Sequence, residues 1–383
     1  MLNKINSEII LKYLYYLIFF IIPLGPVSDL GQSIFGLSIK ATHLIYLGVF
    51  LFGSHYLIFV QKKFFLSNLE IVTYLFFILY IGSYLTTLNL QNNFNSALHV
   101  IIISFLIIIT TNVSWEKKSI NNMIVIFLIS QSLISFLTIV DYFKLIDLYF
   151  LNKSVSANPF FDIANVITAT GPFNSRTPFV MYLLLACVSS LFLAINLNKK
   201  LFILLLLSFL INLICGVFTI SRSFIIVLLL VILIYFSFRY RYKLKTLNFY
   251  SKEKILLYFL SFIFSIIIFL IIFFMSGVFN VEGMPFRPGD MKRVWANLIV
   301  LDEIFNNFYP FQNDDKPWVM DFGRVGFHNI FGFIMHKTGL LGFSCFLFMI
   351  FNIFNLLTKT DYKDNSFLLS LLILSWIFYA IFH

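Results

Sequence analysis

The stretch LFILLLLSFLINLICGVFT, residues 201–219, contains nineteen residues and no charged side chain. A helix needs about 20 apolar residues to cross the hydrocarbon layer of a bilayer. Inside that layer, a helix satisfies its backbone hydrogen bonds within its own segment. The stretch therefore predicts a membrane-spanning helix.

Ten further stretches are similarly apolar and of similar length. They cover residues 9–24, 42–60, 69–88, 96–112, 121–140, 177–196, 223–238, 255–278, 339–357 and 366–382. The first has no small-residue cleavage site after its apolar part, since Pro23-Leu24-Gly25-Pro26 follows, and it is interpreted as a retained span rather than a signal peptide. The pattern predicts an all-α polytopic membrane protein with about eleven transmembrane helices.

The composition of the whole chain agrees with this prediction. Of its 383 residues, 60% are hydrophobic and 11% are charged, and the mean hydropathy is +0.93. A soluble domain has about 25% charged residues, so a soluble enzyme, a nucleic-acid binder and a secreted disulfide scaffold are excluded. Cys187, Cys215 and Cys345 lie in apolar runs without CxxC spacing. They are interpreted as buried small side chains rather than disulfide or metal ligands.

The loops between the predicted spans divide into two sets by charge. One set, which includes the N-terminus and residues 239–254, holds sixteen of the 27 basic residues and six of the 17 acidic ones. The other set holds eleven residues of each sign. Because Lys and Arg are enriched in cytoplasmic loops, the first set is predicted to be cytoplasmic. The N-terminus is then inside the cell.

Two polar segments on the opposite side are long, residues 141–176 and 279–328. Loops longer than 12–15 residues are usually functional or disordered, so the function is expected on this side. Apolar residues at helical spacing predict an amphipathic helix over 290–305. Lys292 and Arg293 fall in its first turn, where a phosphate would bind well. An interfacial helix whose basic side chains contact lipid headgroups is the alternative.

Several familiar catalytic and ligand-binding motifs are absent from the sequence. It contains no Gly-rich phosphate loop, HExxH, paired CxxC, EF-hand or GxGxxG, and the acidic residues of the outer loops lack metal-ligand spacing. No metal and no cofactor are therefore predicted. The spans also lack the mid-membrane Asp or Glu on which ion-coupled pumps depend, which makes a transporter the second choice.

Three features on the outer side carry possible chemistry. A very short turn, Thr219–Ser223, places Arg222 at the membrane boundary, where a guanidinium can hold a phosphate or anchor the helix at the interface. Arg293 is the second feature. The third is His328, in Gly326-Phe327-His328-Asn329-Ile330, which can accept a proton from a hydroxyl near neutral pH or serve a structural role. A short apolar helix and Thr338-Gly339, which opens the next span, follow it.

With these features the chain resembles the O-antigen ligase and O-antigen polymerase superfamily of bacterial envelope biogenesis. The resemblance covers residues 165–357. It rests on Thr170-Gly171-Pro172-Phe173-Asn174-Ser175-Arg176, on Thr219 to Ser223, on Arg293 followed by Trp295, on His328-Asn329 and on Gly339-Leu340-Leu341-Gly342. The chain departs from the family pattern at Gly332 and Lys337, and His336 is a rival base to His328.

The resemblance implies a fold and a set of site residues. Such proteins have a GT-C-like helical bundle, here with a large periplasmic loop before the tenth span, and they lie in the bacterial inner membrane with a periplasmic active site. The catalytic residues would be Arg222, Arg293 and His328. Contacts to glycan or phosphate would come from Arg176, Arg287, Arg324 and Asn329. The domain organisation would be a five-span bundle over 1–140 and a ligase- or polymerase-like region over 141–383.

The resemblance also implies a metal-independent glycosyl transfer. The donor would be a glycan on undecaprenyl diphosphate, and the acceptor a sugar hydroxyl on another lipid-linked unit in a polymerase, or the lipid A core in a ligase. The modest length favours an O-antigen polymerase. The alternatives are an O-antigen ligase and, in a different class, a translocator of lipid-linked sugars. Membrane lipids and a chain-length regulator are the further expected partners, and no nucleic acid is expected.

Overall fold

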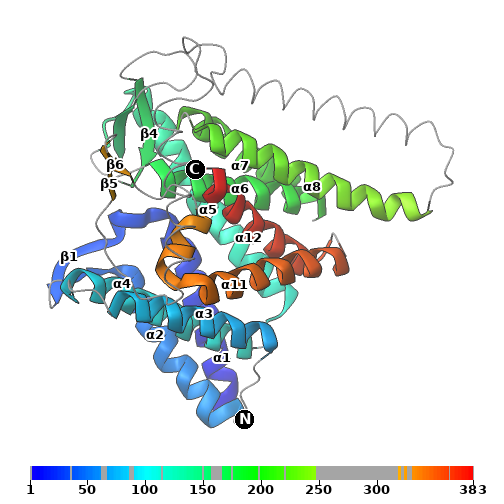
Figure 1. Ribbon diagram of the computed structural model, residues 1–383. Coiled ribbons are helices and arrows are strands. Elements are labelled where there is room, and N and C mark those ends of the chain that lie inside the picture. Colours follow the sequence, from blue (N-terminus) through cyan, green and yellow to red (C-terminus); the bar gives the residue numbers. More distant parts are fainter. Residues whose placement is uncertain are drawn as a thin grey trace. The chain divides into compact units, whose positions relative to one another are not determined.

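The computed structural model is mostly helical (Figure 1). It describes residues 2–34, 37–61, 67–85, 90–113, 115–148, 151–156, 166–173, 176–196, 199–219, 221–246, 318–320, 323–325, 330–361 and 363–382. The predicted span over 255–278 and the predicted amphipathic helix over 290–305 lie outside the described residues.

The other ten predicted spans all coincide with helices. These are α1 (Leu2–Ile21), α2 (Ala41–His55, continued by a π-helical turn at Tyr56–Gln61), α3 (Asn68–Leu85), α4 (Leu90–Asn112), α5 (Lys117–Tyr142), α6 (Arg176–Asn196), α7 (Lys199–Phe218), α8 (Arg222–Thr246), α11 (Ile330–Lys359) and α12 (Asn365–Phe382). Within the described chain, six helices are long and apolar enough to cross a membrane, namely those of α1, α2, α5, α6, α7 and α11. Because of these helices, the protein is an all-α membrane protein. The count of eleven spans stays a prediction.

Helix α8 is longer than the sequence pattern indicates. The region over 239–254 was expected to be a loop, but its first part continues the helix to Thr246. Arg239, Arg241, Lys243 and Lys245 therefore occupy the last turns of α8. Cations are stabilised there because the C-terminal end of a helix carries partial negative charge. This favours continuation of the helix beyond its apolar part.

Among the residues that the structure describes, three antiparallel strand pairs lie in the connections between helices. They are β1 (Asp29–Ile34) with β2 (Leu37–Lys40), β3 (Asn152–Ser156) with β4 (Val166–Gly171), and β5 (Trp318–Met320) with β6 (Gly323–Val325). The second pair falls in the polar segment 141–176 and the third in the segment 279–328. The sequence analysis predicted no strands. Short pairs of this kind satisfy backbone hydrogen bonds where the chain leaves a helix.

The chain divides into two compact units, each described here by itself. Unit 1 comprises residues 1–134 and 295–352, and unit 2 comprises 135–294 and 353–383. The compact units are thus discontinuous in sequence, whereas the expected domains were continuous. The functional division at residue 140 came from the family resemblance and stays a prediction.

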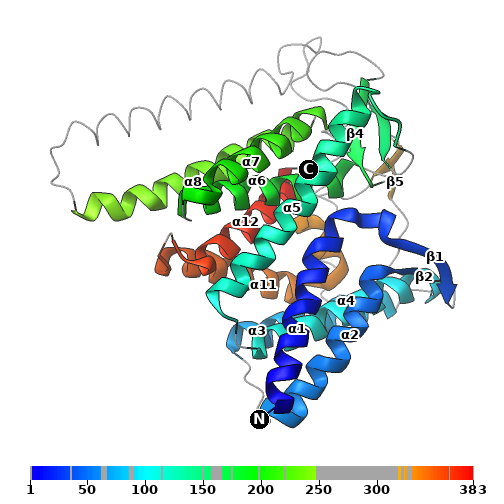
Figure 2. The same ribbon diagram turned by 180° about the vertical axis from the view of Figure 1, so that it is seen from behind.

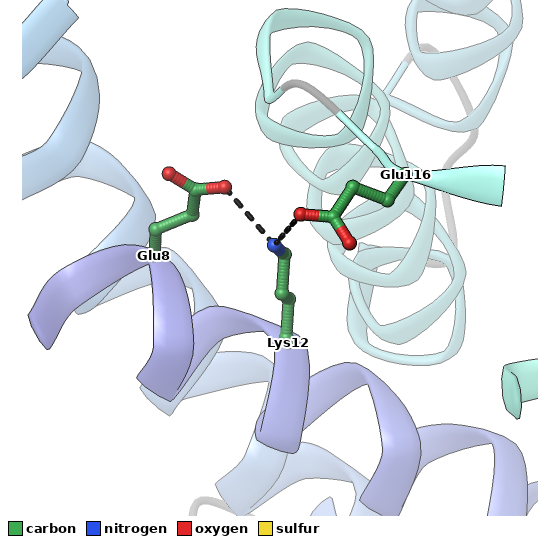
Figure 3. A network of polar contacts seen from close by, with 3 residues as sticks. All are labelled: Glu8, Lys12 and Glu116. Carbon is green, nitrogen blue, oxygen red and sulfur yellow. Dashed lines mark ion pairs between the residues drawn. The ribbon is translucent and has the colours of Figure 1, made fainter. Parts of the chain in front are cut away.

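In unit 1, α1 packs against α2, and α3 packs against α4. The core between α1, α2 and α4 includes Leu11, Tyr15, Val49 and Ile109. Figure 3 shows Lys12 of α1 between two carboxylates, those of Glu8 and Glu116. Its Nζ lies 3.1 Å from Glu8 Oε1 and 3.7 Å from Glu116 Oε1. This cluster ties α1 to the start of α5.

Helix α11, also largely in unit 1, is broken at Gly339. This glycine has φ +63° and ψ −169°, which separates a short apolar helix from the following span. The left-handed φ is readily adopted by glycine because it has no Cβ. The sequence expectation that a short helix precedes a span opening at Thr338-Gly339 is therefore confirmed.

In unit 2, α6 is the central helix. It packs against α7, α8, α12 and β4, and the views from both sides show it among these elements (Figures 1 and 2). Twelve of its side chains are buried. A helix that is buried on most of its circumference packs against several neighbouring helices at once. The candidate site lies at the N-terminal end of α6, where the helix begins at Arg176.

Candidate functional site

A tight turn follows β4 shortly before α6 begins at Arg176. Gly171 ends β4 with φ +59°, and a Cβ at this position would lie 2.6 Å from the ring of Phe179. The Phe173 N–H donates to the Thr170 carbonyl over 3.3 Å, and the Phe173 ring stacks on Tyr182 with centroids 5.4 Å apart. Glycine fits because both the conformation and the space exclude a larger residue. Thr170 to Phe173 thus form a tight turn at the end of β4, and α6 begins at Arg176.

Helix α7 ends at Phe218 and α8 begins at Arg222, so the connection between them is very short. Thr219 is fully buried, and its hydroxyl donates to the Gly216 carbonyl over 2.6 Å. The Phe224 N–H donates to Ser221 Oγ over 3.4 Å, so Ser221 caps α8 and Arg222 is the first residue of the helix. A Cβ on Gly216 would overlap the buried Phe224 ring. The very short turn expected from the sequence is confirmed.

Helix α12 brings a buried tyrosine to these two turns. The Tyr379 side chain is 1% exposed. Its hydroxyl hydrogen-bonds with the side chains of Ser221 and Thr177. Tyr379 therefore joins the starts of α6 and α8. Arg176, Thr177, Ser221, Arg222 and Tyr379 are called the arginine end of unit 2.

Arg176 is the charged centre of this cluster. Its Nη1 atom is buried and has no hydrogen-bond partner among the described residues. The two ion pairs found within the described chain both involve Lys12, not Arg176. A buried donor on a charged group is costly when it is left unpaired. An anion bound at this position would supply the missing partner.

The position of the two arginines in their helices points to the same chemistry. Arg176 is the first residue of α6, and Arg222 is the first residue of α8. The N-terminal end of a helix carries partial positive charge and its free N–H groups favour anions, so a basic residue there is unfavourable for the helix alone. Two arginines at helix N-termini, at the same end of unit 2, are suited to bind a phosphate or diphosphate.

Only part of the site expected from the sequence falls on described residues. Arg176 and Arg222 belong to the same end of unit 2, through the Tyr379 contacts to Thr177 and Ser221. Arg324 lies in β6, opposite Val319, and belongs to unit 1. The remaining four predicted residues, Arg287, Arg293, His328 and Asn329, lie outside the described residues.

Tyr379 and Thr177 were not predicted from the sequence. Tyr379 lies in an apolar stretch near the C-terminus, where a single tyrosine is common and carries no specific signal. Thr177 follows the arginine of a noted motif but has no pattern of its own. Their contacts join residues more than 150 positions apart in the sequence, which no local pattern indicates.

Asp141 and the two cysteines of unit 2 have structural explanations. Asp141, buried near the end of α5, accepts a hydrogen bond from the Leu148 N–H over 3.0 Å and so closes the following turn. Cys187 and Cys215 are free and buried, and so is Cys345 of unit 1, as predicted. In the part of the chain that the structure describes, no group of three or more His, Cys, Asp or Glu side chains is arranged to hold a metal ion. The prediction of no metal stays a prediction.

Fold and site together describe a helical membrane protein in which α6 begins at a partly buried arginine, Arg176, whose Nη1 has no hydrogen-bond partner among the described residues. Comparison with known proteins finds no matching protein-family model, no significantly similar curated protein and no significantly similar solved structure.

Proposed function

We propose that this protein is a metal-independent membrane glycosyltransferase of the O-antigen polymerase type. It transfers a glycan from undecaprenyl diphosphate to a sugar hydroxyl at the periplasmic face of the bacterial inner membrane. The observation that supports this most is the arginine end of unit 2, where Arg176 has a buried unpaired Nη1 and α8 begins at Arg222. A diphosphate is an anion that suits such a cluster.

The proposed topology has eleven spans and a cytoplasmic N-terminus. In that topology, α6 and α8 begin on the periplasmic side, and the segments 141–176 and 279–328 face the periplasm. The charge bias of the loops supports this orientation. The arginine end would then meet the diphosphate of a lipid-linked donor at the level of the headgroups.

The proposed reaction is a displacement at the anomeric carbon of the donor. The acceptor hydroxyl oxygen forms a new bond to that carbon, and the bond from the carbon to the diphosphate oxygen breaks. Its electron pair leaves with undecaprenyl diphosphate, and the hydroxyl proton passes to His328. Arg222 and Arg293 stabilise the negative charge that grows on the leaving group. Arg176 contacts the diphosphate or the glycan, together with Arg287, Arg324 and Asn329.

The size of each contribution can be estimated from general enzyme chemistry. Removal of one donor that stabilises developing charge costs about 10²–10³-fold in rate. A general base contributes about 10²–10⁴-fold. An Arg222→Gln protein and a His328→Ala protein are each expected to reach the membrane at normal levels and to lose most of their transfer activity. Full activity of either variant contradicts the role assigned to that residue.

The test of the function is the lipopolysaccharide ladder of a bacterial strain deleted for the encoding gene. Core carrying a single repeat unit, with no ladder, is the expected result, because ligation continues without polymerisation. Bare core with polymerised glycan on the lipid carrier would indicate the ligase instead. An unchanged ladder contradicts both transferase functions in this pathway. Complementation with the wild-type gene and with the Arg222→Gln gene, at equal protein levels, provides the matched control.

A further inference from the structure

We infer that unit 1 holds a binding site for one acyl chain of a membrane phospholipid, in an apolar groove between α2 and α4. The groove has a volume of about 320 Å³, and among its lining side chains only those of His43 and Tyr46 carry polar groups. Helices α2 and α4 pack against each other, and both ribbon views show them side by side (Figures 1 and 2). This site goes beyond the proposed function, because none of its residues takes part in the transfer reaction.

One end of the groove is closed by direct contact between the two helices. A Cβ on Gly53 of α2 would lie 2.7 Å from Ile109 Cδ1, so the backbone of α2 touches this α4 side chain. Nearer the helix starts, the rings of Phe50 and Phe105 meet edge to face with centroids 5.3 Å apart. The facing residues increase in number together, so α2 and α4 run in the same direction. A chain that enters the groove from the helix starts must therefore end before Gly53.

The opposite end of the groove coincides with the start of the apolar part of both helices. The candidate span of α2 covers His43–Val60, and the apolar part of α4 covers Ile101–Asn112. His43 and Ile101 are also the first lining residues on each helix. From there the groove runs inward for about 10–12 Å, at a rise of 1.5 Å per residue. One leaflet of the hydrocarbon layer is about 15 Å thick, so the groove lies along the acyl chains of a single leaflet.

The lining and the surroundings of the groove require a hydrocarbon occupant. Four of its lining residues are 37–54% exposed, so the groove is open along its side; they are Leu47, Phe50, Ile101 and Phe105. The surrounding medium is lipid, since α2 is one of the helices long and apolar enough to cross a membrane. Water does not fill an apolar space, and walls without partner atoms lose their dispersion contacts. A lipid chain in the groove restores those contacts.

Size and polarity favour one acyl chain of a phospholipid over other lipid chains. A cavity of about 150 Å³ holds a benzene ring, so the groove has room for about twelve carbons. An undecaprenyl chain is several times longer and would not end before Gly53. The polar side chains of the lining, His43 and Tyr46, belong to the first turns of α2, which begins directly after Lys40. Basic residues at a membrane surface attract the phosphate of a lipid headgroup.

The test uses phosphatidylglycerol that carries a diazirine at the end of one acyl chain, with the full-length protein in phosphatidylcholine nanodiscs. Light converts the diazirine into a carbene with loss of N₂, and the carbene inserts into neighbouring bonds. Mass spectrometry of peptides then locates the label. Labelling is expected to concentrate at the closed end of the groove, near Phe105 and Ile109. It is expected to exceed, several-fold, the labelling of lipid-facing positions such as Ile203 on α7, which is 67% exposed.

Two matched tryptophan variants test the position of the chain. Leu47→Trp places a bulky ring in the groove and is expected to lower the labelling there about tenfold, because overlap replaces the chain contacts. Leu51→Trp is the control, since Leu51 is 57% exposed, against 54% for Leu47, and does not line the groove. Its labelling is expected to equal that of the wild type. Ile102→Phe, on the α4 wall, is a second groove variant with a loss expected in the same direction.

Two outcomes would overturn the inference. Label spread over the lipid-facing helix surfaces in proportion to their exposure would indicate surrounding lipid only. A diazirine-labelled undecaprenyl phosphate tests the other source of a hydrocarbon chain. Groove labelling by this probe, and not by phosphatidylglycerol, contradicts the assignment to a phospholipid. Neither outcome bears on the proposed function, which is tested by the lipopolysaccharide ladder.

Discussion

Each of the two units contains a partly buried cation at a helix, and the two cations are partnered differently. Lys12 in unit 1 lies between Glu8 and Glu116, at 3.1 and 3.7 Å, with its side chain 18% exposed. Arg176 in unit 2 has a buried Nη1 without a hydrogen-bond partner in the described chain. A cation that is paired within the protein serves the fold. A cation left unpaired at a burial cost indicates a ligand from outside.

The largest expected effect tests this comparison directly. Arg176→Gln is expected to lower glycosyl transfer about 10²-fold, because one donor to the anionic group is lost, while the thermal stability changes little. Lys12→Gln is expected to show the reverse, with activity preserved and the stability lowered. Transfer assays in membrane vesicles and melting curves of the purified proteins measure the two effects. Equal behaviour of the two variants would remove the distinction between the cations.

The next effect concerns the turn that carries Arg176. Gly171→Ala is expected to destabilise the protein by about 3 kcal/mol, since φ is +59° and the new Cβ would lie 2.6 Å from Phe179. Gly48→Ala in α2 of unit 1 is the matched control. Its Cβ would be 3.5 Å from Leu14, an ordinary contact, so no loss of stability is expected. Thermal unfolding in detergent compares the two, and an unaffected Gly171→Ala protein would contradict the described turn.

A smaller effect is expected at the cap of α8. Ser221→Ala removes the acceptor of the Phe224 N–H and one partner of Tyr379, at a cost of about 1 kcal/mol. Ser221→Thr keeps a hydroxyl and is expected to retain most of the stability. Hydrogen exchange at the first turn of α8 measures the change locally. Exchange as slow in Ser221→Ala as in the wild type would show that Ser221 is not the cap.

The smallest effect is expected in the paired cluster of unit 1. The Glu116 side chain is 73% exposed, so Glu116→Gln is expected to change the stability by less than about 0.5 kcal/mol. Glu8→Gln removes the shorter and less exposed contact to Lys12 and is expected to cost more. Melting curves at low and high salt measure both, and the difference is expected to shrink as salt screens the charges. A larger effect for Glu116 would reverse this order.

The sequence anticipated the parts of the site that depend on local rules. Thr219–Ser223 was predicted as a short turn because it separates two apolar runs, and Gly339 was predicted to open a span after a short helix. Both features depend on neighbouring residues and were confirmed. The strand pairs and the extension of α8 to Thr246 were not anticipated. The strand pairs form through backbone hydrogen bonds, and the extension of α8 is favoured by basic residues at the C-terminal end of the helix. Neither feature follows from the pattern of apolar residues.

The sequence by itself determined that this is a membrane protein made of helices, because a long apolar segment in lipid must satisfy its hydrogen bonds internally. It also predicted which arginines would carry chemistry, from their place at the ends of apolar runs, and that stays a prediction. Only the tertiary structure decided that Tyr379 joins Thr177 and Ser221. Such a contact is set by how three helices pack, and the packing of distant segments leaves no periodic signal in any one of them.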